Sequence, residues 1–142
     1  MEGKKFLTVA QKMLQIRSEE ATRSAFSRIY YAVFNTGAKL LNELGFDLPK
    51  DGTAHERLYQ RLNNSGISAT EEIAAWLGDL RQRRTRADYD MDSREFQSHK
   101  SCEFYLVRAI LVITQLENCY QQPLRNRLKD GIIKYERKIG LH

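Results

Sequence analysis

Four arginines fall within six residues of the stretch at positions 76–90, which reads WLGDLRQRRTRADYD. On a helix, Arg84 lies in the middle of an apolar face. A guanidinium cannot lose its proton, so a buried one needs a partner, and Asp88 stands one helical turn away. Either Arg84 extends past the core to water, or this face meets a polar ligand in a cleft or at a subunit interface. The residues that share the face with Arg84 are Ile73, Trp76, Leu77, Leu80 and Ala87.

An arginine can bind a phosphate through two parallel hydrogen bonds and can stabilise charge that develops on phosphorus. Such a site could cleave a phosphodiester beside a ribose 2′-hydroxyl without a metal ion, if another group moves the protons. The candidate catalytic residues are therefore Arg84, Asp88 and Tyr89. The remaining arginines of the cluster are candidate phosphate-binding residues: Arg81, Arg83 and Arg86.

Motifs for several other chemistries are absent from the sequence. It contains no glycine-rich phosphate loop, no H-E-x-x-H, no cluster of cysteine and histidine, and no G-x-S-x-G. We therefore expect no metal site and no cofactor.

Apolar residues recur at helical spacing along most of the chain, which predicts an all-α, antiparallel four-helix-type bundle with a short extra helix. Ser18 or Thr22 can cap the second helix, and Gly45 can end it. Ser68 with Glu71, and Asp92 with Glu95, match the capping-box pattern at the start of two further helices. The predicted helices cover residues 4–17, 18–44, 55–62, 68 to about 89, and 92 to about 120.

Several other residues allow more than one interpretation. Tyr30 and Tyr31 could stack a nucleobase, although aromatic residues at helical spacing favour a place in the core. His55 has no metal-ligand partner at a suitable spacing, which predicts a surface residue without a functional role. Cys102 and Cys119 are too few for a disulfide scaffold, so we expect both to be reduced and to lie in or near the core.

Positive charge is concentrated at the C-terminal end of this 142-residue sequence. Residues 122–142 hold six lysines or arginines and only two acidic residues, whereas the net charge of the whole sequence is +5. We predict a bundle over residues 1–121 and a loosely attached, basic helical extension over residues 122–142. Arg125, Arg127 and Lys129 could contact a polyanion, or the helix could serve solubility alone.

No segment has the length of apolar residues that a membrane span requires, and the N-terminal residues lack a secretory pattern. We therefore expect a soluble, cytoplasmic protein of one domain with no membrane partner.

Three segments together resemble the HEPN family, in its prokaryotic branch with an R-x-x-A-D-Y motif. They are SAFSRIYYAVFNTGAKLLNELG at 24–45, LRQRRTRADYD at 80–90 and SREFQSHKSCEFYLVRAILVI at 93–113, and the likeness covers about residues 20–118. The motif here runs from Arg84 to Tyr89. The histidine of the family's nuclease signature is replaced by Tyr89.

The resemblance implies a four-helix bundle that forms a homodimer through the motif helix. Many HEPN proteins are metal-independent ribonucleases of toxin–antitoxin or antiphage systems. The resemblance therefore implies RNA as the target and a cognate antitoxin as partner. In this hypothesis Arg84 holds the scissile phosphate, Asp88 orients Arg84, and Tyr89 or an unidentified residue moves the proton. Other members are non-catalytic, and bind a nucleotide, RNA or a partner such as a small nucleotidyltransferase. A third possibility is that Arg84 and Asp88 form only an interface ion pair.

Overall fold

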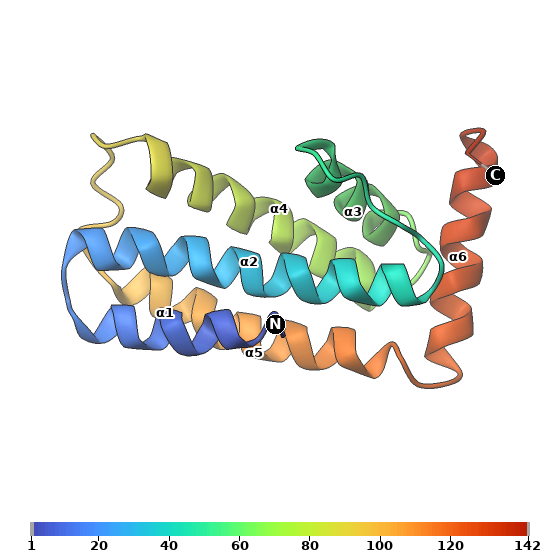
Figure 1. The fold of residues 1–142 in the computed structure, drawn as a ribbon, viewed down its shortest axis with the longest axis horizontal. Helices are drawn as coiled ribbons and strands as arrows, with labels where there is room; N and C mark the ends of the chain where they lie inside the picture. Colours follow the sequence, from blue (N-terminus) through green and yellow to red (C-terminus); the bar gives the residue numbers. More distant parts are fainter. Residues whose placement is uncertain (1, 142) are drawn as a thin grey trace.

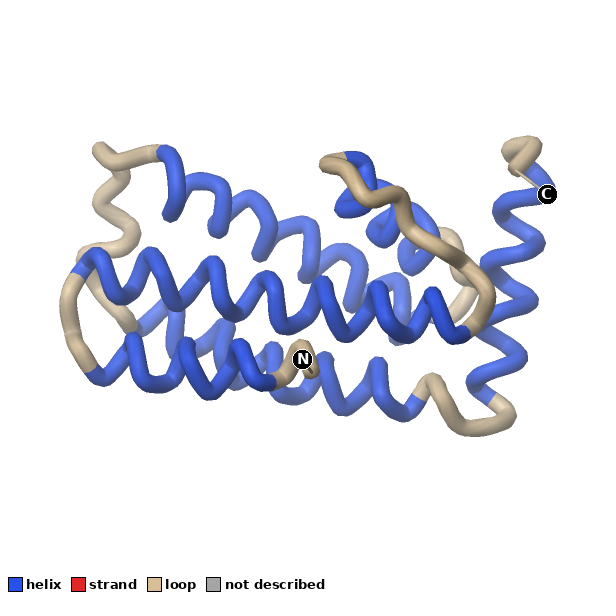
Figure 2. Tube along the Cα trace, viewed as in Figure 1, coloured by secondary structure: helices blue, strands red, loops and turns tan. Residues whose placement is uncertain are grey.

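The computed structural model describes residues 2–141, which form six α-helices and no strand (Figure 2). This confirms the predicted all-α class. The helices begin and end within a few residues of the predicted limits, except that the fifth helix begins later than predicted. The helices are α1 (Lys5–Gln15), α2 (Glu19–Glu43), α3 (Thr53–Asn63), α4 (Ser68–Tyr89), α5 (Lys100–Asn118) and α6 (Leu124–Lys138).

The helix α2 runs through the middle of the bundle and packs against α1, α4 and α5 (Figure 1). These four helices alternate in direction along the chain. The shorter α3 packs mainly on α4, and α6 crosses the end of the bundle at which α4 begins. The second half of α4, which carries the arginines, therefore lies away from α6.

Local capping signals predict some helix ends correctly and others wrongly. The Ser18 hydroxyl accepts a hydrogen bond from the backbone N–H of Ala21 at 3.1 Å, and Gly45 follows α2 with a φ of 97°. Both ends of α2 are thus confirmed. The predicted capping box at Ser68 is wrong, because Ser68 is already helical and Ile67 occupies the N-cap without a side-chain bond.

The predicted start of the fifth helix near Asp92 is also wrong, since α5 begins only at Lys100. The backbone between α4 and α5 instead folds around the side chain of Arg23, a buried residue of α2 that is 7% exposed. The Arg23 guanidinium donates hydrogen bonds of 2.9–3.3 Å to five backbone carbonyls. These carbonyls belong to Arg86, Ala87, Asp90, Met91 and Ser93.

Arg23 thereby satisfies the Ala87 carbonyl in the last turn of α4, which accepts no backbone hydrogen bond from another described residue. Its positive charge also complements the negative end of the helix dipole. The guanidinium lies 4.7 Å from the centre of the Phe96 ring, and its Nε lies 3.2 Å from a carboxylate oxygen of Glu19. One side chain of α2 therefore fixes where α4 ends.

The C-terminal helix is docked more firmly than we predicted. Leu128 and Ile132 are fully buried, and Glu136 accepts a 2.7 Å hydrogen bond from Arg61 of α3 in a buried ion pair. A Cβ atom on Gly131 would lie only 1.8 Å from the carbonyl oxygen of Ser65, so α6 approaches the preceding turn at backbone distance. The prediction of a loosely attached extension is wrong, because its apolar face is covered by the bundle.

Replacing Arg23 by lysine should lower the free energy of unfolding by about 3 kcal/mol. An ammonium has three N–H donors and cannot reach five carbonyls that lie around a planar guanidinium. Urea unfolding would measure the loss, with Arg28→Lys at an exposed position of the same helix as the matched control. Equal stability of the two variants would contradict the capping role of Arg23.

Candidate functional site

Arg84 is held inside the protomer by residues of two helices. Its Nε lies 3.0 Å from a carboxylate oxygen of Asp88, and its Nη2 donates a 2.8 Å hydrogen bond to the hydroxyl of Tyr31. The guanidinium also lies 5.1 Å from the centre of the Tyr31 ring and 5.9 Å from that of Tyr30. The predicted pairing of Arg84 with Asp88 is therefore confirmed. The hydrogen bond to Tyr31 ties the Arg84 side chain, which is only 18% exposed, to α2.

Two further arginines of the cluster are paired with carboxylates. Arg86 makes hydrogen bonds of 3.1 and 3.3 Å to both carboxylate oxygens of Glu95. Arg83 lies 3.7 Å from a carboxylate oxygen of Asp79 and 3.9 Å from one of Glu95. These side chains are partly exposed, so each ion pair contributes little to stability. The pairs nevertheless place an acidic group beside two of the candidate phosphate-binding residues.

Arg81 differs from the other three arginines. Among residues 2–141 its guanidinium has no carboxylate within 4.0 Å and makes no side-chain hydrogen bond. It lines a cavity of about 500 Å³ together with Tyr30, His55 and Tyr59. Arg81 is thus a half-buried cation beside a cavity between α3 and α4, and it forms no ion pair with another described residue.

His55 lies beside this cavity and not on the open surface, so its predicted position is wrong. Its ring stacks on Phe34 with centroids 4.4 Å apart, and its Nδ1 lies 2.6 Å from the hydroxyl of Tyr30. The signal for this position was present in the sequence, because Leu58, Tyr59 and Leu62 follow His55 at helical spacing on the side of α3 that packs against the bundle.

Burial and two nearby charges control the protonation of this pair. Desolvation lowers the pKa of His55, and the positive charges of Arg81 and Arg84 lower it further. Burial raises the pKa of Tyr30 to about 12 in spite of the same two arginines. At neutral pH the imidazole is therefore neutral and the phenol keeps its proton. Tyr30 is buried, as we expected for a core residue.

The other predicted site residues are not gathered at this place. Tyr89 is the last residue of α4 and is 74% exposed, and its hydroxyl makes no hydrogen bond to any described residue. Arg125, Arg127 and Lys129 belong to α6, at the opposite end of the molecule from the C-terminal end of α4 (Figure 1). The structure thus separates the basic C-terminal residues from the arginine cluster.

No family model, no curated protein and no solved structure matches this chain. No helix in the described part of the chain is both long and apolar enough to cross a membrane. Residues 2–141 also contain no group of three histidine, cysteine, aspartate or glutamate side chains placed to hold a metal ion. Cys102 and Cys119 are free and buried, as predicted.

The lowered pKa of His55 predicts a loss of stability in acid. Unfolded histidine binds a proton below about pH 6.5, whereas His55 in the folded protein resists protonation, so stability falls as pH drops through this range. Urea unfolding between pH 8 and 5 should show this fall in the wild type and a smaller one in His55→Gln. His99→Gln, on the loop before α5, is the control and should keep the wild-type fall. An identical pH dependence in His55→Gln would contradict the burial of a neutral imidazole.

Proposed function

We propose that this chain is a HEPN-type RNA-targeting protein that cleaves RNA without a metal ion, as part of a prokaryotic toxin–antitoxin or antiphage system. The observation that carries this proposal is the unpaired guanidinium of Arg81 beside the internally paired Arg84. An unpaired cation on a rigid helix provides a place for a phosphate, because no internal ion pair must first be broken.

The proposal gives each residue of the motif a chemical role. Arg81 binds the phosphate, and Arg84, which is paired with Asp88, adds a second positive charge on the same helix. The 2′-oxygen of the ribose attacks phosphorus, the bond to the 5′-oxygen breaks, and Tyr89 exchanges protons with these oxygens. An exposed phenol at the end of α4 is free to reach a bound strand.

A second function has its own supporting observation. Arg84 is already paired with Asp88 and donates a hydrogen bond to Tyr31, which is the arrangement of a structural tie between α4 and α2. In that case the protein is a non-catalytic HEPN dimer that binds a nucleotide, RNA or a partner such as a small nucleotidyltransferase or a cognate antitoxin. Because of this tie, replacing Arg84 would disturb the fold as well as the site.

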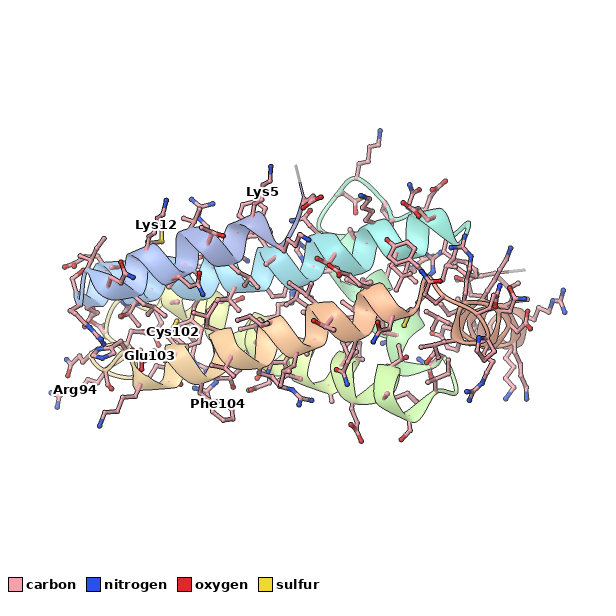
Figure 3. All side chains as sticks on the ribbon, turned by 90° about the horizontal axis from the view of Figure 1, so that it is seen from below. Lys5, Lys12, Arg94, Cys102, Glu103 and Phe104 are labelled. Atoms are coloured by element: carbon pink, nitrogen blue, oxygen red, sulfur yellow. The ribbon has the colours of Figure 1, made fainter. Side chains whose placement is uncertain are left out.

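The exposed apolar residues of α5 support the proposed homodimer. Phe104 is 71% exposed and projects outward from α5 (Figure 3), and Val107, Ile110 and Leu111 are also exposed on this helix. The stripe adjoins the motif helix, because the neighbouring Tyr105 contacts α4. A contiguous apolar surface of this kind is typical of an interface, so we propose that α4 and α5 together face a second copy.

Purified wild-type protein should fragment total cellular RNA or a tRNA pool in the presence of EDTA. Arg81→Gln should reduce the rate about a hundredfold, because it removes one charge-stabilising group. Fragments resolved on a denaturing gel would measure the effect, and Arg94→Gln, at an exposed arginine on the loop after α4, is the matched control. No cleavage by the folded wild type would exclude the nuclease and favour the binding protein.

Phe104→Asp should convert the proposed dimer to a monomer, since an unpaired carboxylate cannot be buried in an apolar interface without a large cost. Sedimentation equilibrium at micromolar concentration would give the mass of each species. Glu117→Gln, an exposed change on the same helix, should leave the mass unchanged. A wild-type monomer, or a Phe104→Asp dimer, would contradict this interface.

A further inference from the structure

The cavity between α3 and α4 borders the arginine cluster and also contains aromatic side chains. Its volume of about 500 Å³ falls in the range of small-molecule sites, roughly 300–1,000 Å³. Tyr30 of α2 lies at one side, and His55 and Tyr59 reach it from α3. Arg81 of α4 adds the charge. Three helices of the bundle thus hold its lining in place.

One part of the lining is built to receive an anion. The Tyr30 hydroxyl lies 2.6 Å from the Nδ1 atom of His55, and we assign the phenol as the donor, with His55 in the Nε2–H tautomer. The neutral imidazole then carries its own proton on Nε2, which becomes a hydrogen-bond donor. With the unpaired guanidinium of Arg81, this part of the lining offers two kinds of N–H donor and one positive charge.

Other parts of the lining suit the base and sugar of a nucleotide. Tyr59 brings a ring that can pack against a nucleobase, and this ring lies close to α4, since an added Cβ on Gly78 would be 3.5 Å from it. Glu56 and Asp79 supply carboxylate oxygens that can accept hydrogen bonds from ribose hydroxyls or a base amino group. These two negative charges also disfavour a ligand with several phosphates.

We propose that the cavity between α3 and α4 binds one nucleotide of a single-stranded RNA, with its phosphate on Arg81 and the His55 Nε2–H and its base against Tyr59. The proposal rests on the RNA-targeting function proposed above, but it does not depend on cleavage. It gives a role in ligand binding to His55, which lies outside the R-x-x-A-D-Y motif.

Fluorescence anisotropy with a labelled 2′-O-methyl RNA trinucleotide tests this site, because the methyl group prevents attack by the 2′-oxygen. Arg81→Gln and His55→Gln should each weaken binding about tenfold, the effect of losing one hydrogen bond to a charged group. Arg94→Gln and His99→Gln are the matched controls and should bind as the wild type does. Circular dichroism would show that each variant is folded, and Arg81→Gln changes a half-buried side chain that has no internal partner.

Competition experiments distinguish a nucleotide from inorganic phosphate as the ligand of this cavity. Adenosine 5′-monophosphate should displace the trinucleotide from the wild type at lower concentration than inorganic phosphate does, since only the nucleotide also contacts Tyr59. Equal competition by inorganic phosphate would overturn the role of the base, and binding of the mononucleotide without the trinucleotide would overturn RNA as the ligand.

The binding and cleavage experiments test the nucleotide site and the nuclease function separately. If the wild type cleaves RNA but Arg81→Gln and His55→Gln bind the trinucleotide like their controls, the cavity is not the nucleotide site and this proposal is overturned. If binding depends on Arg81 and His55 but no RNA is cleaved, the nuclease function fails and the nucleotide site stands.

Discussion

The arrangement of the arginine cluster depends on the contact between Arg23 and the end of α4. Five carbonyl groups converge on this guanidinium, which fixes the C-terminal end of α4 against α2. Because α4 is a continuous helix, fixing its end also sets its rotation about its own axis. That rotation brings Arg84 to Tyr31 of α2 and leaves Arg81 facing α3. A change at Arg23 should therefore disturb the site from a distance.

The four arginines of α4 differ in the charge that they can offer to a ligand. Arg83, Arg84 and Arg86 each lie within 4.0 Å of a carboxylate, whereas Arg81 does not in the described part of the chain. Paired charges must lose an existing contact before they bind an anion, so the unpaired one binds at lower cost. The cavity beside Arg81 therefore has a charge that the ion pairs elsewhere on α4 do not neutralise.

The sequence was sufficient to predict the features that depend on local spacing. Helical periodicity gave α2 and α4 nearly to their ends, and the four-residue separation of Arg84 and Asp88 predicted their ion pair. The number of helices around the central α2 followed from the same pattern, because each amphipathic segment has an apolar face to bury.

Features that depend on residues far apart in the chain could not be predicted in this way. The capping of α4 joins Arg23 to carbonyls more than 60 residues away, and backbone carbonyls have no sequence signal. The late start of α5 follows from that contact. The docking of α6 depends on Arg61 and Glu136, which are 75 residues apart. The position of His55 could have been predicted, since its spacing from Leu58 and Leu62 places it on the packed side of α3.

The salt dependence of RNA binding tests most directly whether Arg81 alone supplies the free charge. Each phosphate contact by a cation releases counterions, so the slope of log affinity against log salt counts the charges that bind. We expect Arg81→Gln to reduce this slope by about one unit and Arg83→Gln to leave it at the wild-type value. An equal reduction in both variants would show that the internally paired arginines also bind the phosphate, and that Arg81 is not the one free charge of the cluster.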